Sequence, residues 1–119
     1  MSMTTFSSGN DVLAVQRAYE LAAWLLPKVE KFKRESKFTL GERLISASLD
    51  LLEALASAAY ESNRTALLAH ASRRLNALRM LLRLSKDLRL LGVDQYGFAA
   101  EHIDEIGRMI GGWRKSERV

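Results

Sequence analysis

Apolar residues recur along this chain at steps of three and four, the spacing that places side chains on one face of an α-helix. Four such segments follow one another, at about residues 11–34, 39–60, 64–91 and 94–113. Leucine and alanine, which favour helices, dominate the apolar residues, whereas the β-branched residues that favour strands are sparse. The pattern predicts an all-α protein.

Capping residues and the only proline predict the limits of the first helix. Asn10 and Asp11 are suited to cap its start. Pro27 lies inside it, removes one backbone donor and crowds the preceding turn. We therefore expect a bend or break near residues 23–26.

The later helices also carry end signals. Residues 35–38 read as a connection, and Thr39 with Glu42 fits a capping box that starts the second helix. Gly92 is placed to end the third helix as a left-handed C-cap. Asp94 is placed to cap the fourth.

Short connections between four helices predict an up-down-up-down bundle over residues 11–113, between a flexible tail at 1–10 and a C-terminal tail at 114–119. The second and third helices are apolar over more than one stripe. The third carries the row Leu68, Ala71, Leu75, Leu78 and Leu82, and a second set of Leu81, Leu84, Leu88 and Leu91. A helix this apolar usually has a second neighbour, so we expect a homo-oligomer.

Composition excludes several classes of protein. The 119 residues contain no cysteine, which excludes a disulfide framework and a thiolate metal site. The longest apolar run, residues 21–26, is too short to span a membrane. Residues 1–10 lack the basic start and apolar middle of a secretory signal, so we expect a cytoplasmic protein.

One segment concentrates the positive charge. The formal net charge is +4, yet residues 63–92 alone carry seven cations against one acid, Asp87. Residues 40–62 and 93–113 each have a balance of −3. The cations that we take as candidate binding residues are Arg73, Arg74, Arg79, Arg83, Lys86 and Arg89.

Part of this segment forms a polar stripe, because Ser72, Asn76, Arg79, Arg83 and Lys86 fall within about 80° of helical arc. Its three cations repel one another when no acid lies beside them. The stripe is consistent with an ordinary solvated face. It is also consistent with a phosphate-binding track, since guanidinium groups match phosphate oxygens, or with docking to an acidic protein surface.

The remaining polar residues give no sign of catalysis or metal binding. The cations after Pro27 are diluted by acids, and those near the C-terminus are also interpreted as solvated. His70 and His102 lack the glutamate three residues earlier that a carboxylate-bridged metal site in a bundle would show. No phosphate-binding glycine loop and no nucleophile with an evident base is present. We therefore expect no enzyme, no metal and no cofactor.

Glycines are unusual inside the last helix, because each costs up to about 1 kcal/mol relative to alanine. Gly107 and Gly111 lie four residues apart and leave bare backbone on one face, which permits close approach of another helix. Trp113 would be the adjoining apolar plug, and Gly112 would begin the fraying end. We interpret this as a helix-packing motif.

Three stretches together resemble the accessory variability determinant proteins of bacterial diversity-generating retroelements. They are KFTLGERL at residues 37–44, LRMLLRLSKDLRLL at 78–91 and QYGFAAEHIDEIGRMIGGW at 95–113, within a similarity that covers roughly residues 15–115. The ending DEIGR followed by GGW is the most specific part. The related four-helix proteins encoded in ribosomal RNA intervening sequences are a weaker match, because their Ile-Pro-Ser-Asn-Ile-Ala-Glu-Gly-like segment has no counterpart here.

The resemblance implies a four-helix protomer that assembles into a barrel-like homopentamer with a basic surface. Such a protein would bind the element's reverse transcriptase and template RNA or cDNA, and would be required for mutagenic cDNA synthesis without catalysing it. On the family's pattern, Arg79, Arg83 and Lys86 are the binding positions. The alternative function is a bundle that associates with ribosomal RNA or another RNA particle.

Overall fold

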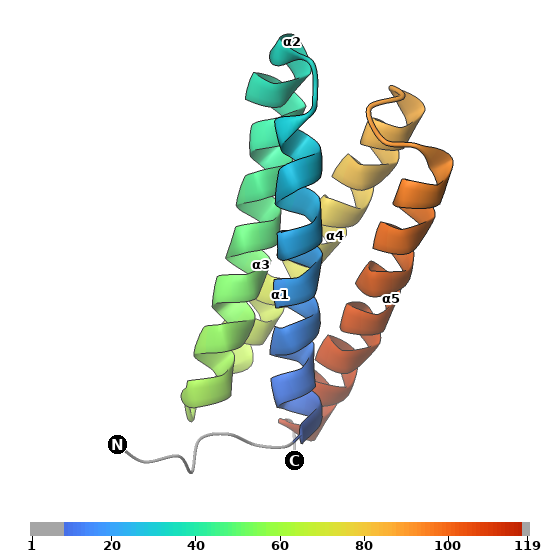
Figure 1. The fold of residues 1–119 in the computed structure, drawn as a ribbon. Helices are drawn as coiled ribbons and strands as arrows, with labels where there is room; N and C mark the ends of the chain where they lie inside the picture. The colour runs from blue at the N-terminus through green and yellow to red at the C-terminus, as the bar shows by residue number, and fades with distance from the viewer. Residues whose placement is uncertain (1–8, 118–119) are drawn as a thin grey trace.

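The computed structural model describes residues 9–117, and they form a helical bundle (Figure 1). Its four long helices are α1 (Gly9–Glu30), α3 (Glu42–Tyr60), α4 (Thr65–Asp87) and α5 (Val93–Ser116). The short helix α2 (Arg34–Ser36) and the π-helical turn η1 (Lys37–Gly41) precede α3 directly. The predicted four-helix bundle is confirmed. Most of the predicted N-terminal tail, residues 1–8, lies outside the described residues, and α1 already includes Gly9.

The long helices form a closed ring in which each one packs on two others. α1 contacts α3 and α5, and α4 contacts the same two helices. Consecutive long helices run in opposite directions, so the topology is up-down-up-down (Figure 1). The bundle measures 45 × 25 × 20 Å.

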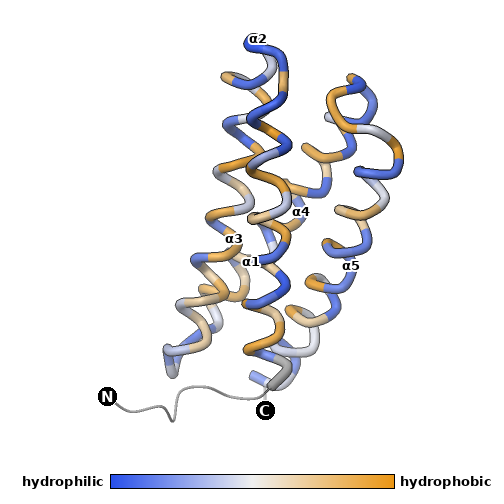
Figure 2. The backbone as a smooth tube through the Cα atoms, viewed as in Figure 1, coloured by the Kyte–Doolittle hydropathy of each residue, from blue (hydrophilic) through white to orange (hydrophobic). Residues whose placement is uncertain are grey.

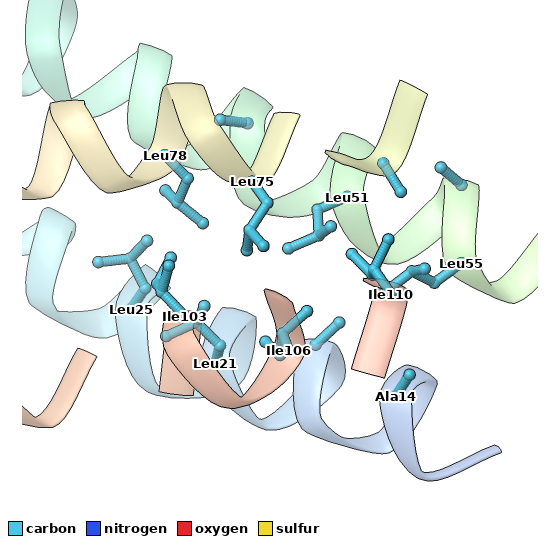
Figure 3. Packing of buried hydrophobic residues seen from close by; sticks show 14 of the residues in the cluster. Ala14, Leu21, Leu25, Leu51, Leu55, Leu75, Leu78, Ile103, Ile106 and Ile110 are labelled. Carbon is cyan, nitrogen blue, oxygen red and sulfur yellow. The ribbon is translucent and has the colours of Figure 1, made fainter. Parts of the chain in front are cut away.

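The core lies on the axis of this ring, where all four helices contribute aliphatic side chains (Figure 3). The figure shows Leu21 and Leu25 of α1 beside Ile103 and Ile106 of α5, with Leu78 of α4 across from them. The predicted row of α4 is buried over its whole length: Leu68, Ala71, Leu75, Leu78 and Leu82. Hydrophobic and hydrophilic residues alternate along every long helix (Figure 2), as helices with one buried face require.

Helix α1 passes through Pro27 without a break, so of the two outcomes expected near residues 23–26, a bend or a break, the break is wrong. Proline lacks the N–H that would bond the carbonyl of Ala23. Both residues are exposed, and water can therefore satisfy that carbonyl. The helix ends at Glu30, a turn earlier than predicted, and the buried side chain of Phe32 anchors the following bend.

The predicted capping box at Thr39 is also wrong, because the chain is already helical from Arg34. The Thr39 hydroxyl donates to the carbonyl of Glu35 at 2.8 Å, so it bonds the preceding turn rather than a backbone N–H. Residues 35–38, expected to be a connection, are helical. The connection is the bend at residues 31–33, which is N-terminal to the predicted one.

The third long helix ends earlier than predicted, at Asp87, and its left-handed residue is Arg89. Arg89 has φ 61°, and the N–H of Leu90 then bonds the carbonyl of Ser85 at 2.8 Å. Gly92, predicted to occupy the left-handed position, has φ −71°. A loop of five residues therefore separates α4 from α5.

Gly92 belongs to the start of α5, where its N–H donates to Oε1 of Gln95 at 2.9 Å. It therefore takes the cap position that we assigned to Asp94, and Asp94 lies in the first turn. α5 continues to Ser116, so Arg114 and Lys115 belong to its last turn rather than to a C-terminal tail.

Candidate nucleic-acid interface

The six candidate cations do not form one row, because five of them lie on α4 at different helical phases and Arg89 lies in the loop that follows. Arg73, Arg83 and Arg89 are exposed, and none of the three forms an ion pair with another residue in the range 9–117. These three guanidinium groups can meet an external anion without the loss of an ion pair within the described chain.

Arg79 differs from them because a carboxylate of the neighbouring helix meets it. Its Nη1 donates to Oδ1 of Asp104 at 2.5 Å, between α4 and α5. The side chains of Arg79 and Asp104 are 41% and 54% exposed, so solvent screens the pair. Exposed ion pairs contribute only about 0–1 kcal/mol to the free energy of unfolding. The sequence of α4 alone showed no acid beside Arg79, because the acid comes from α5.

Arg74 and Lys86 also have local partners. Nε of Arg74 lies 3.9 Å from Oδ2 of Asp50 on α3, and this nitrogen is buried without a hydrogen-bond partner within the described part of the chain. Nζ of Lys86 lies 3.5 Å from Asp87 and 4.9 Å from the centroid of the Tyr96 ring. Arg74 faces α3, whereas Lys86 packs on α5.

The seventh cation of the segment, Arg64, is a structural residue. It is 6% exposed, and its Nε donates to the carbonyl of Glu61 at 2.8 Å. Its guanidinium lies 5.8 Å from the ring centroid of Trp113, a buried residue in the last turns of α5. Trp113 is therefore part of the core, in the place expected for the apolar plug.

A cleft of about 420 Å³ runs between α4 and α5, along the edge that carries the predicted stripe. Ser72, Asn76 and Arg79 line it from α4, and α5 contributes Arg108 and Arg114. Sequence analysis missed these two arginines as site residues. Their spacing in the sequence could have identified them, because it places Arg108 and Arg114 on the same side of α5 as Gly107 and Gly111.

The two glycines of the predicted packing motif both line this cleft. A Cβ at Gly107 would lie 3.4 Å from Cδ2 of Leu75, an ordinary packing distance. At Gly111 a Cβ would meet nothing within 4 Å among the described atoms. Within the described chain, the packing of another helix therefore requires a glycine at neither position.

The surplus apolar surface predicted for the third helix is present. Leu84 and Leu88 are 46% and 58% exposed, and with Phe38 they line a second cleft of about 610 Å³ between η1 and the end of α4. Met80, one turn before Leu84, is 59% exposed. Leu81 is half-buried and Leu91 is buried, so only part of the second set faces solvent.

Among the described residues, neither histidine belongs to a group of side chains that could bind a metal ion. Nδ1 of His102 lies 3.2 Å from the carbonyl oxygen of Phe98, and His70 is exposed. The part of the chain that the structure describes contains no cluster of three or more metal-binding side chains. No helix of residues 9–117 is long and apolar enough to cross a membrane.

Fold and surface together define a small four-helix protein whose third long helix is basic on its outer side. Compared with known protein families, the sequence matches the bAvd-like family over residues 12–117. The chain belongs to that family, which confirms the resemblance found in the sequence. No curated protein and no solved structure matches it significantly.

Proposed function

We propose that this protein is a non-catalytic accessory factor of a diversity-generating retroelement. It binds the element's reverse transcriptase and the template RNA or cDNA, and mutagenic cDNA synthesis requires it. Membership of the bAvd-like family supports this role. The observation that carries nucleic-acid binding is the exposure of Arg73, Arg83 and Arg89 without a carboxylate partner among residues 9–117.

This arrangement supports the proposed binding to a polyanion. Unpartnered guanidinium groups already hold the geometry that phosphate oxygens accept, and no ion pair has to be broken first. Contacts with phosphates release counterions, so affinity depends steeply on salt. Assembly into a barrel-like homopentamer would repeat the three groups around a ring and multiply the contacts. Exposed Met80, Leu84 and Leu88 provide apolar surface for such an assembly.

The experiment measures binding of a single-stranded RNA at two or more salt concentrations. The triple variant Arg73→Ala/Arg83→Ala/Arg89→Ala should bind more weakly, and its slope of log K against log salt should fall by about 0.7 for each phosphate that it no longer neutralises. The control Lys31→Ala/Lys33→Ala/Lys115→Ala removes the same charge from exposed positions elsewhere. Equal affinity and slope for the two variants would exclude α4 as the binding surface.

The polymerase part of the proposal needs its own readout. The proposal predicts that a reverse transcriptase is encoded beside this gene, that it co-purifies with the wild-type protein and that it depends on this protein for cDNA synthesis. Loss of cDNA in the triple variant, with co-purification retained, would assign the α4 cations to nucleic acid. A polymerase that makes the same cDNA without this protein would contradict the accessory role.

A further inference from the structure

The cleft between α4 and α5 is lined by more positive than negative side chains. Three of its lining residues are arginines, Arg79, Arg108 and Arg114, and one is an acid, Asp104. The arginines come from two different helices and surround one cavity of about 420 Å³. This volume lies in the range of cavities that hold small ligands.

The charged groups of the cleft are poorly satisfied by the protein itself. Arg108 and Arg114 form no ion pair within the described chain. Arg79 has one bond, from Nη1 to Asp104, whereas a guanidinium offers five N–H donors. Ser72 and Asn76 add neutral polar side chains on the α4 wall. The cleft therefore offers an anion several donors that no protein group occupies.

The α5 wall of the cleft is bare backbone at two positions. Gly111 has open space around the place of a Cβ, so packing within the chain does not require a glycine there. Glycine in a helix still costs up to about 1 kcal/mol relative to alanine. At Gly107 a Cβ would lie 3.8 Å from Nη2 of Arg79 and would narrow the space beside that guanidinium. Both glycines keep the cavity open next to its cations.

We propose that this cleft is a phosphate-binding site whose empty state is held by the Arg79–Asp104 ion pair. Phosphate displaces the Asp104 carboxylate and takes over Arg79, while Arg108 and Arg114 supply further donors. The exchange is favourable because a bidentate guanidinium–phosphate contact replaces a single bond of an exposed pair. Asp104 thus acts as an internal competitor of the ligand.

The side chains that line the cleft can recognise the phosphate group of a ligand but not a nucleic-acid base. No aromatic side chain of residues 9–117 lines the cleft, so these residues offer no surface on which a base could stack. Under the proposed function, the phosphate belongs to the backbone of a polynucleotide. The choice of this ligand rests on that proposed function. Oligonucleotides of different sequence should then bind alike, because phosphate contacts carry no sequence information.

A charge variant tests the competition directly. Asp104→Asn should bind a short single-stranded RNA several-fold more tightly, since it frees Arg79 and removes a negative charge from the cleft. The control Glu101→Gln removes the same charge from an exposed position one turn away on α5. An increase for Asp104→Asn no larger than that for Glu101→Gln would reject the ion pair as a latch.

A second pair of variants fills the cleft without disturbing the fold. Gly111→Gln should weaken RNA binding about tenfold, because its side chain occupies the cavity. It should fold normally, since no atom of the described residues lies within 4 Å of the place of its Cβ. Gly112→Gln is matched, because Gly112 is equally open but does not line the cleft. Equal affinities for the two variants would overturn the site.

The same variants show whether the ligand is free phosphate or the phosphates of a polynucleotide backbone. They also test the cleft independently of the exposed arginines Arg73, Arg83 and Arg89. Calorimetry with inorganic phosphate should show binding that Gly111→Gln weakens if free phosphate is the ligand. An effect on RNA without measurable binding of inorganic phosphate would identify the polynucleotide backbone. If the cleft variants bind like wild type while the triple α4 variant does not, the cleft proposal fails and the proposed function stands.

Discussion

Arg17 of α1 joins Glu105 of α5, with 3.2 Å between Nε and Oε2, and so connects the first and last long helices. Nη1 of the same guanidinium lies 3.0 Å from Glu20, one turn along α1. The hydrogen bond to Glu105 is the main cause that raises the pKa of Arg17. A hydrogen bond from Gln16, followed by the charge of Arg17, lowers the pKa of Glu20 against an opposing effect of desolvation.

The lowered pKa of Glu20 predicts that stability falls in acid. The pKa of Glu20 is lower in the folded protein than its ordinary value of 4.5, so its contribution is present above that pH and is lost as pH falls through the lowered pKa. Urea unfolding midpoints between pH 7 and pH 3 should fall more steeply for wild type than for Glu20→Gln. Glu53→Gln, at an exposed position without an ion pair in the described structure, is the control. Identical pH profiles for Glu20→Gln and wild type would contradict the linkage.

The left-handed backbone at Arg89 predicts a stabilising substitution. A residue with a Cβ pays about 1 kcal/mol in this conformation, and glycine does not. Arg89→Gly should therefore raise the free energy of unfolding by about 0.5–1 kcal/mol, measured from urea midpoints. Gly92→Ala, where φ is −71°, relieves no left-handed strain and replaces the N-cap glycine of α5, so it should not raise this free energy. A stabilising Gly92→Ala together with a destabilising Arg89→Gly would mean that the loop has a different conformation from the one described.

The helices themselves were predictable because their signal is periodic. Apolar residues at helical spacing define a buried face, and Leu68 to Leu82 lie where that spacing places them. The ends of the helices were less predictable, because they depend on single residues. Thr39 has a side chain that often caps a helix start, yet it donates to the carbonyl of the preceding turn. Gly92 could adopt the left-handed conformation that commonly ends a helix, but Arg89 adopts it instead.

The candidate site shows the same division. The charge surplus of residues 63–92 was evident from the sequence, and exposed Arg73, Arg83 and Arg89 agree with it. The partners were not evident, because they come from other helices. Asp104 reaches Arg79 from α5, and Asp50 approaches Arg74 from α3. A pairing of this kind depends on which helices are neighbours, and helical phase within one segment does not contain that information.

Two glycines that look alike in the sequence should respond oppositely to alanine. A Cβ at Gly41 would lie 2.9 Å from Cγ1 of Val29 and 3.3 Å from the carbonyl oxygen of Ser36. Gly41→Ala should therefore cost about 1–3 kcal/mol of unfolding free energy through overpacking. Gly111→Ala should stabilise the protein by up to about 1 kcal/mol, because it gains helix propensity and its Cβ meets no described atom within 4 Å. Thermal and urea unfolding of both variants checks this, and a Gly41→Ala protein as stable as wild type would contradict the close approach.

Neighbouring leucines of α4 separate folding from self-association. Leu82 is 1% exposed, so Leu82→Ala should cost about 2–5 kcal/mol of unfolding free energy. Leu84 is 46% exposed, and Leu84→Glu should fold with little loss but reduce the mass of the proposed oligomer in light scattering. Val93→Glu, at a position 75% exposed on another helix, should leave that mass unchanged. If Leu84→Glu has the same mass as wild type, or if wild type is a monomer at high concentration, the exposed face of α4 does not hold subunits together and the apolar surface there needs a different partner.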